Sequence, residues 1–170
     1  MIQVTIREAT EDDLDKFKNI VSERKRGFFR ETFKKGRICF IALVGEKIAY
    51  LCWISFEDEY ESNCRIRAKF NRKKAYLFDG YTVPQYRENR LHTPMITKRL
   101  VYPKNKGYGK ARLLVWNENT YARKVVTKAG FKGKRIVTLI ELFGFEFHIW
   151  RKFRGSFKIW KTNLRISLQT

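Results

Sequence analysis

The spacing of apolar side chains changes along the chain, and each spacing predicts a different kind of element. Residues 2–7 alternate apolar and polar side chains, which predicts a first strand. Thr10 precedes three acidic residues, as is typical of a helix N-terminus, and helical spacing continues to Gly36. Two apolar runs at 38–44 and 48–55 follow, and the Gly-Glu-Lys turn between them predicts a β-hairpin.

The rest of the chain alternates strand-like and helix-like segments. Residues 56–74 are polar and predict a loop or a short helix. Pro84 ends one strand, Pro94 fits the first turn of a helix, and Pro103 is expected beyond that helix. Gly130 suits the end of the last helix. The predicted elements are a strand at 75–83, a helix at 91–101, a buried central strand at 111–116, a helix at 120–129, and strands at 135–140 and 143–150.

Composition is typical of a folded protein with a real core. The chain has 170 residues, of which 44% are hydrophobic, and it contains only three prolines. We expect one domain over residues 1–150, with residues 151–170 as a basic aromatic extension packed on it or continuing it. No apolar run approaches the roughly 18 residues of a membrane-spanning helix. We therefore expect a soluble cytoplasmic protein.

Charge is distributed very unevenly. Residues 1–60 carry 11 basic and 11 acidic side chains, whereas residues 61–170 carry 26 basic and 6 acidic ones, so the whole net charge of +20 lies in the second part. Such a surface attracts polyanions, including RNA, DNA and anionic lipid. A basic surface that only aids solubility is the alternative explanation.

The cysteines indicate neither a metal site nor a disulfide framework. Cys39, Cys52 and Cys64 are odd in number, and no two have the spacing of metal ligands. Cys39 and Cys52 lie in apolar runs, which predicts buried, reduced thiols.

Two segments carry a resemblance to a known family. The motifs P-Q-Y-R-E-N-R-L-H at 84–92 and N-E-N-T-Y-A-R-K-V-V-T-K-A-G-F at 117–131, with the order of elements around them, resemble the GNAT superfamily of acetyl-CoA-dependent N-acyltransferases. The resemblance implies an α/β (α+β) fold, with a mixed, mostly antiparallel sheet of six or seven strands flanked by about four helices. It also implies transfer of an acyl group, in the first instance acetyl, from acetyl-CoA or another acyl-CoA to a primary amine.

The first motif is the expected phosphate loop of this cofactor. A strand that turns directly into a helix directs backbone N–H groups at one point, where the helix dipole adds positive potential. Glycines usually stand where this chain has Glu88, Arg90 and His92. Either the amides still hold the pyrophosphate, helped by the cationic character of the arginines and the histidine, or the loop keeps the fold and has lost the cofactor. The predicted cofactor-binding residues are Tyr81, Thr82, Val83, Arg87, Glu88, Asn89, Arg90, Leu91, His92, Thr93, Asn117 and Asn119.

Catalytic residues are harder to assign. The family often has a tyrosine on the last helix that protonates the departing thiolate, but Val126 occupies that position here, and Tyr121 is the nearest substitute. A base is needed to deprotonate an ammonium substrate. Asp79 is the single acid in the strand at 75–83, so it is the candidate base. The amine is expected to attack the thioester directly.

The extension at 151–170 suggests other functions. Its six basic residues alternate with aromatic and aliphatic ones, a mixture that suits single-stranded nucleic acid, an anionic membrane surface, or an added element that closes the sheet. The alternative to catalysis is therefore a degenerate GNAT-fold protein that binds nucleic acid or anionic membrane through its basic half. An acyltransferase that is peripheral at the membrane is a further alternative.

Overall fold

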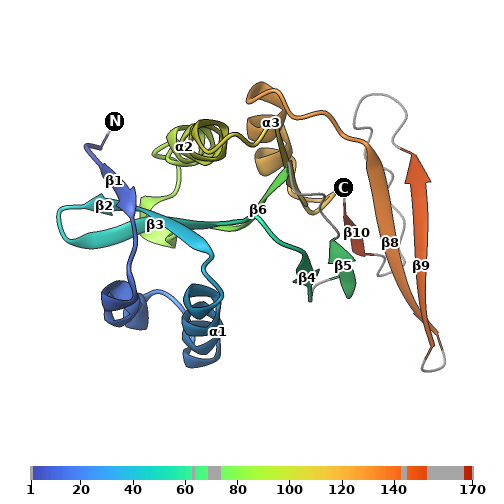
Figure 1. Cartoon of the computed structure of the whole chain (residues 1–170), viewed down its shortest axis with the longest axis horizontal. Helices are drawn as coiled ribbons and strands as arrows, with labels where there is room; N and C mark the ends of the chain where they lie inside the picture. The colour runs from blue at the N-terminus through green and yellow to red at the C-terminus, as the bar shows by residue number, and fades with distance from the viewer. Residues whose placement is uncertain (1, 63, 69–73, 143–144, 153–166, 170) are drawn as a thin grey trace. The chain divides into compact units, whose positions relative to one another are not determined.

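The chain folds into two compact units (Figure 1). One consists of Met1–Asp58 with Phe70–Leu113, and the other of Glu59–Lys69 with Leu114–Thr170. The single domain predicted for residues 1–150 stays a prediction, and most of the predicted extension lies outside the described residues. The computed structural model describes residues 2–62, 64–68, 74–142, 145–152 and 167–169.

The first unit is built on one mixed sheet of five strands. Their order is β1-β2-β3-β6-β7, and every neighbouring pair is antiparallel except β6 and β7, which are parallel. The predicted fold class is confirmed, although the largest sheet has five strands instead of six or seven because the last strands form a sheet of their own. The bounds are β1 Thr5–Glu8, β2 Ile38–Val44, β3 Lys47–Ser55, β6 Lys74–Thr82 and β7 Lys110–Leu113.

Helices cover both faces of this sheet, with η1 (Glu11–Asn19) and α1 (Glu23–Lys34) on one side and α2 (His92–Asn105) on the other (Figure 1). Trp53 of β3 is fully buried and packs against Phe29 and Phe33 of α1. Phe40 of β2 contacts Tyr102 of α2 edge to face. Because successive strand residues face opposite sides, the apolar runs of β2 and β3 fill both layers.

Three predictions about this region were wrong. β7 is a short edge strand with partly exposed side chains, not a buried central one. Pro103 lies inside α2, where it is buried in the last turn and therefore removes a hydrogen bond only near the helix end. The polar stretch 56–74 contains two short paired strands, β4 (Glu59–Glu61) and β5 (Ile66–Ala68).

The second unit contains β4, β5, α3 (Thr120–Lys128), β8 (Arg135–Leu142), β9 (Phe145–Lys152) and β10 (Ser167–Gln169). β8 pairs with β9 on one edge and with β10 on the other, antiparallel in both cases. The side chain of Asn119 accepts a hydrogen bond from Ala122 N and caps α3, while Gly130 ends it with φ +91°. Within the described residues, no helix is both long and apolar enough to span a membrane.

Candidate functional site: an opened sheet edge and a loop of unused amides

A bulge interrupts β6 where it lies beside β3. Tyr81 pairs with Leu51 and Phe78 pairs with Trp53, so Asp79 and Gly80 together face a single residue of β3. Asp79 adopts φ +50°, an unusual conformation for a residue with a side chain. The bulge therefore turns β6 and re-aims its backbone at this point.

The same strand has an open edge from the bulge onward. The pairing of β6 with β7 ends at Leu77 and Leu113, whereas β6 continues to Thr82. Val83 already donates its N–H to Ala49 O and accepts from Tyr86 N through its carbonyl. Of the three predicted cofactor-binding residues here, Tyr81 and Thr82 thus lie on the open part of β6, while both backbone groups of Val83 are used within the protein.

The carboxylate of Asp79 lies at the bulge and is partly occupied. Its Oδ1 is 2.7 Å from Nζ of Lys25 on α1. Its Oδ2 is buried, and it has no hydrogen-bond partner among the residues that the structure describes. A buried carboxylate oxygen without a donor is uncommon in a folded protein, and it is an acceptor available to an incoming proton.

Gly80 is surrounded by polar side chains on the α2 side of the sheet. A Cβ added to it would lie 2.7 Å from the hydroxyl of Tyr50 and 3.2 Å from Nη1 of Arg99, so no larger residue fits without displacing them. Arg99 is 3% exposed, and its Nη2 donates to the carbonyls of Trp53 and Phe78. These bonds attach α2 to both strands beside the bulge and place a buried positive charge there.

His92 at the start of α2 extends this cluster. Its Nδ1 lies 2.8 Å from the hydroxyl of Tyr50. Burial, and secondly the charge of Arg99, lowers the pKa of His92 from 6.5 to about 4. The expectation that the His92 side chain is a cation for the phosphate is therefore wrong, because the ring is neutral near pH 7 and bonds to Tyr50.

The loop before α2 keeps the backbone conformation that glycines would adopt. Glu88 has φ +68° and Arg90 has φ +56°, and Leu91 follows in the right-handed helical region. In the described part of the chain, the backbone N–H groups of residues 88–91 donate to no protein acceptor. Successive amides in such alternating conformations form a concave anion-binding site.

One side chain of the loop bonds to its backbone, and three others are exposed to solvent. Asn89 donates through Nδ2 to the carbonyls of Tyr86 and Arg87 and so braces the turn. Arg87, Glu88 and Arg90 are exposed. The N–H of Thr93 already bonds to Arg90 O, so this amide, unlike those of residues 88–91, is occupied.

The remaining predicted residues belong to the second unit. Tyr121 is 57% exposed on α3, and Val126 is buried. Oδ1 of Asn117 accepts a hydrogen bond from Arg123, and Asn119 caps the helix. Both asparagines thus have local structural roles, and their contact with a cofactor stays a prediction.

The cysteines are structural. All three are free and buried. Burial raises the pKa of the Cys39 thiol and raises that of Cys52 and Cys64 to about 11. Such thiols are protonated at neutral pH and make poor nucleophiles.

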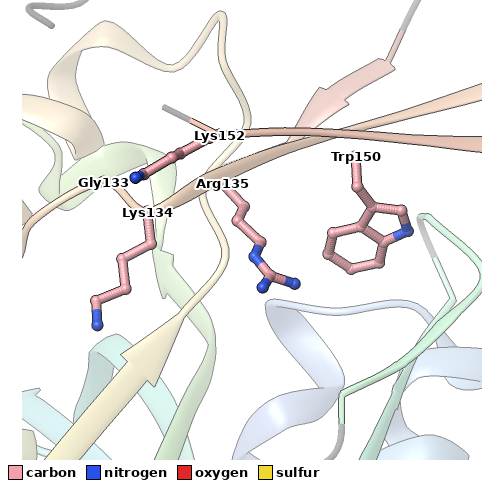
Figure 2. A pocket seen from close by; sticks show the side chains of 5 residues that line it. All are labelled: Gly133, Lys134, Arg135, Trp150 and Lys152. Carbon is pink, nitrogen blue, oxygen red and sulfur yellow. The ribbon is translucent and has the colours of Figure 1, made fainter. Parts of the chain in front are cut away.

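A hollow of about 610 Å³ lies in the second unit (Figure 2). It is lined by Gly133, Lys134, Arg135, Trp150 and Lys152. Figure 2 shows Arg135 and Trp150 projecting to the same side of their two strands. The sequence predicted a cluster of basic and aromatic side chains at residues 151–170. It gave no sign that Lys134 and Arg135 belong with them, because only strand pairing brings these two residues beside Trp150 and Lys152.

No protein-family model matches the chain. An uncharacterized N-acetyltransferase of Methanocaldococcus jannaschii is 28% identical to it over 141 residues, which are 78% of this chain and 62% of that protein. The chain thus spans less than two thirds of the length of this curated relative.

Solved structures share the fold. An N-acetyltransferase from Staphylococcus aureus superposes with a TM-score of 0.64 at 14% identity, covering 87% of this chain and 95% of that one. A GNAT-family acetyltransferase from Streptococcus pneumoniae gives 0.59 at 18% identity, covering 87% and 96%. The aminoglycoside N-acetyltransferase AAC(6')-Iy, solved with CoA, gives 0.58 at 20% identity, covering 75% and 91%.

These matches define the class of fold as that of the acetyltransferases. The chain shares the fold of GNAT acetyltransferases, as the resemblance carried by its two sequence motifs implied.

Proposed function

We propose that the protein is a GNAT-type N-acyltransferase that moves an acetyl group from acetyl-CoA to a primary amine. The observation that carries this proposal is the row of unused amides at residues 88–91, with Glu88 and Arg90 held at positive φ. A side chain at positive φ costs roughly 1–2 kcal/mol. A loop that keeps this conformation twice without glycine retains the shape of an anion site.

The pyrophosphate of the cofactor lies on these amides, and the exposed guanidinium groups of Arg87 and Arg90 add charge-assisted contacts. Glu88 opposes this anion through its carboxylate. Two arginines against one glutamate leave the loop with a net positive charge, so the altered sequence still favours binding.

The pantetheine arm lies along the open edge of β6 beside Tyr81 and Thr82, where strand alternation turns the backbone groups of Thr82 away from β3. The pairing of β6 with β7 stops at Leu77, which leaves this edge for a ligand strand. The thioester then reaches the bulge at Asp79 and Gly80. The uncommon backbone there orients its polar groups toward the reacting carbonyl.

The chemistry needs an unprotonated amine and a stabilised leaving group. Asp79 accepts the proton of the incoming ammonium through its unoccupied Oδ2, while Lys25 holds the other oxygen in place. The nitrogen forms its bond to the carbonyl carbon, and the carbon–sulfur bond breaks to give the CoA thiolate, which takes up the second proton lost by the nitrogen. The buried charge of Arg99, beside Gly80, favours this anion.

Tyr121 remains a proposed proton donor to the thiolate. Its replacement by phenylalanine separates the alternatives, since a thiol with an ordinary pKa of about 8.5 leaves with little help. Loss of the hydroxyl lowers kcat by about 10²-fold if it acts as the acid. An unchanged kcat would show that Tyr121 does not donate this proton.

Titration calorimetry with CoA and with acetyl-CoA, followed by release of free thiol in the presence of a panel of primary amines, tests the proposal. We expect binding in the micromolar range and amine-dependent thiol release. The matched variants Arg87→Gln and Arg112→Gln each remove one exposed positive charge, the first in the loop and the second on β7. Weakened binding for Arg87→Gln alone supports the site, and an absence of binding at millimolar CoA overturns the proposal.

A further inference from the structure

The hollow in the second unit combines positive charge with an exposed aromatic ring. Arg135 and Lys152 are directly opposite each other in the β8–β9 pair, and Trp150 lies two residues before Lys152 on the same face. Like charges at directly opposed positions destabilise a sheet. An anion between them would remove this repulsion.

Within the described residues, the cations of this hollow have no acidic partners. Lys134, Arg135 and Lys152 form no ion pair with any carboxylate of the described residues. The two acids of the β8–β9 hairpin, Glu141 and Glu146, lie toward its other end and both pair with Arg65. The hollow is therefore a place of concentrated, uncompensated positive potential.

Trp150 gives the hollow a second chemical property. Trp150 is 51% exposed. Figure 2 shows its indole on the same side of the strands as the guanidinium of Arg135. An exposed indole at the edge of a basic hollow offers a flat apolar surface on which a nucleobase can stack. The volume of about 610 Å³ is within the range of small-molecule sites.

Strand alternation argues against a membrane as the occupant. Phe145, Phe147 and Ile149 are exposed, and they lie on the face of β9 opposite to Trp150 and Lys152. A peripheral membrane surface needs its cations and its apolar side chains on one face. Here the hollow's cations are accompanied by a single aromatic ring.

We propose that this hollow binds a phosphorylated nucleoside, either as a free nucleotide or within a single-stranded nucleic acid. Phosphate lies between Arg135 and Lys152, with Lys134 as a further contact, and the base stacks on Trp150. Gly133 also lines the hollow and has no side chain to occupy it. This site is independent of the acyl-CoA site proposed above.

Fluorescence anisotropy of a labelled octauridylate with the full chain tests the proposal. The double variant Lys134→Gln/Arg135→Gln is compared with Lys124→Gln/Lys128→Gln, which removes the same charge from exposed positions of α3 in the same unit. We expect the first pair to weaken binding by at least 10-fold and to lower the slope of log K against log salt by about 1.4, or roughly 0.7 per lost phosphate contact. The control pair should change binding by less than about 3-fold.

Trp150→Ala and Trp150→Phe test the stacking. We expect about a 10-fold loss for alanine and near-wild-type binding for phenylalanine, which retains a ring. Equal effects of the two charge pairs, or full binding by Trp150→Ala, overturn the proposal. Where adenosine monophosphate competes, equally strong competition by inorganic phosphate also overturns it.

The same assay separates the two sources of the ligand. If adenosine monophosphate displaces the labelled octamer at concentrations similar to those at which the unlabelled octamer does, the site takes free nucleotides. If only oligonucleotides compete at these concentrations, the site takes single-stranded nucleic acid. Absence of binding by both probes at millimolar nucleotide contradicts the proposal and leaves the acyl-CoA titration unaffected.

Discussion

Acidification should destabilise the first unit through one side chain, His92. Its ring is largely buried against Tyr50, and its pKa is lowered from 6.5 to about 4. The unfolded chain therefore binds more protons than the folded one between these two values, so stability is complete above pH 6.5 and is lost as the pH falls toward 4. With these two pKa values, lowering the pH from 7 to 4.5 removes about 2 kcal/mol.

Urea denaturation at both pH values measures this loss. The variant His92→Gln keeps a polar side chain and cannot titrate, so it isolates the contribution of the histidine from that of the carboxylates. We expect wild type to lose about 2 kcal/mol more than His92→Gln over this interval. Equal losses in the two proteins would show that His92 does not cause the destabilisation. Because the chain has only two histidines, NMR titration can also follow the His92 ring directly.

Three further predictions concern the bulge and the loop. Glu88→Gly should bind CoA several-fold more tightly, because it removes a carboxylate from the anion site and a side chain at positive φ; calorimetry measures the change, and weaker binding would count against the site. Gly80→Ala should destabilise the protein by about 1–3 kcal/mol in urea, since its Cβ would lie 2.7 Å from the Tyr50 hydroxyl; wild-type stability would show that the packing is loose. Asp79→Asn should lower kcat/KM for amine acetylation by about 10²-fold or more while CoA still binds, and an unchanged rate would remove Asp79 as the base.

Much of the fold follows from local patterns. The hairpin at β2 and β3, the strand β6 and the helix α3 lie within a residue or two of their predicted positions, because apolar periodicity, Gly45 and the Asn119 cap act locally. The prediction that β7 is a buried central strand was wrong. Its apolar run indicates that the strand packs against other residues, but it does not indicate which place the strand has in the sheet. Its place at the sheet edge depends on pairing with a distant strand.

The candidate site was predicted in position but not in detail. Sequence motifs placed the loop at Glu88 and Arg90, yet their positive φ values and the unused amides appear only in three dimensions. Arg99 carries no motif, and its role at the bulge arises from bonds to carbonyls of two strands. His92 was expected to be a cation because local sequence does not reveal burial.

We propose that the amides of residues 88–91 hold the phosphates of an acyl-CoA. A ¹H–¹⁵N correlation spectrum of the full chain, recorded during addition of CoA, reads these four amides individually. We predict that they show the largest shifts in the first unit and that Glu88→Gly reaches saturation at lower CoA. Unchanged positions of all four amides at millimolar CoA would contradict it.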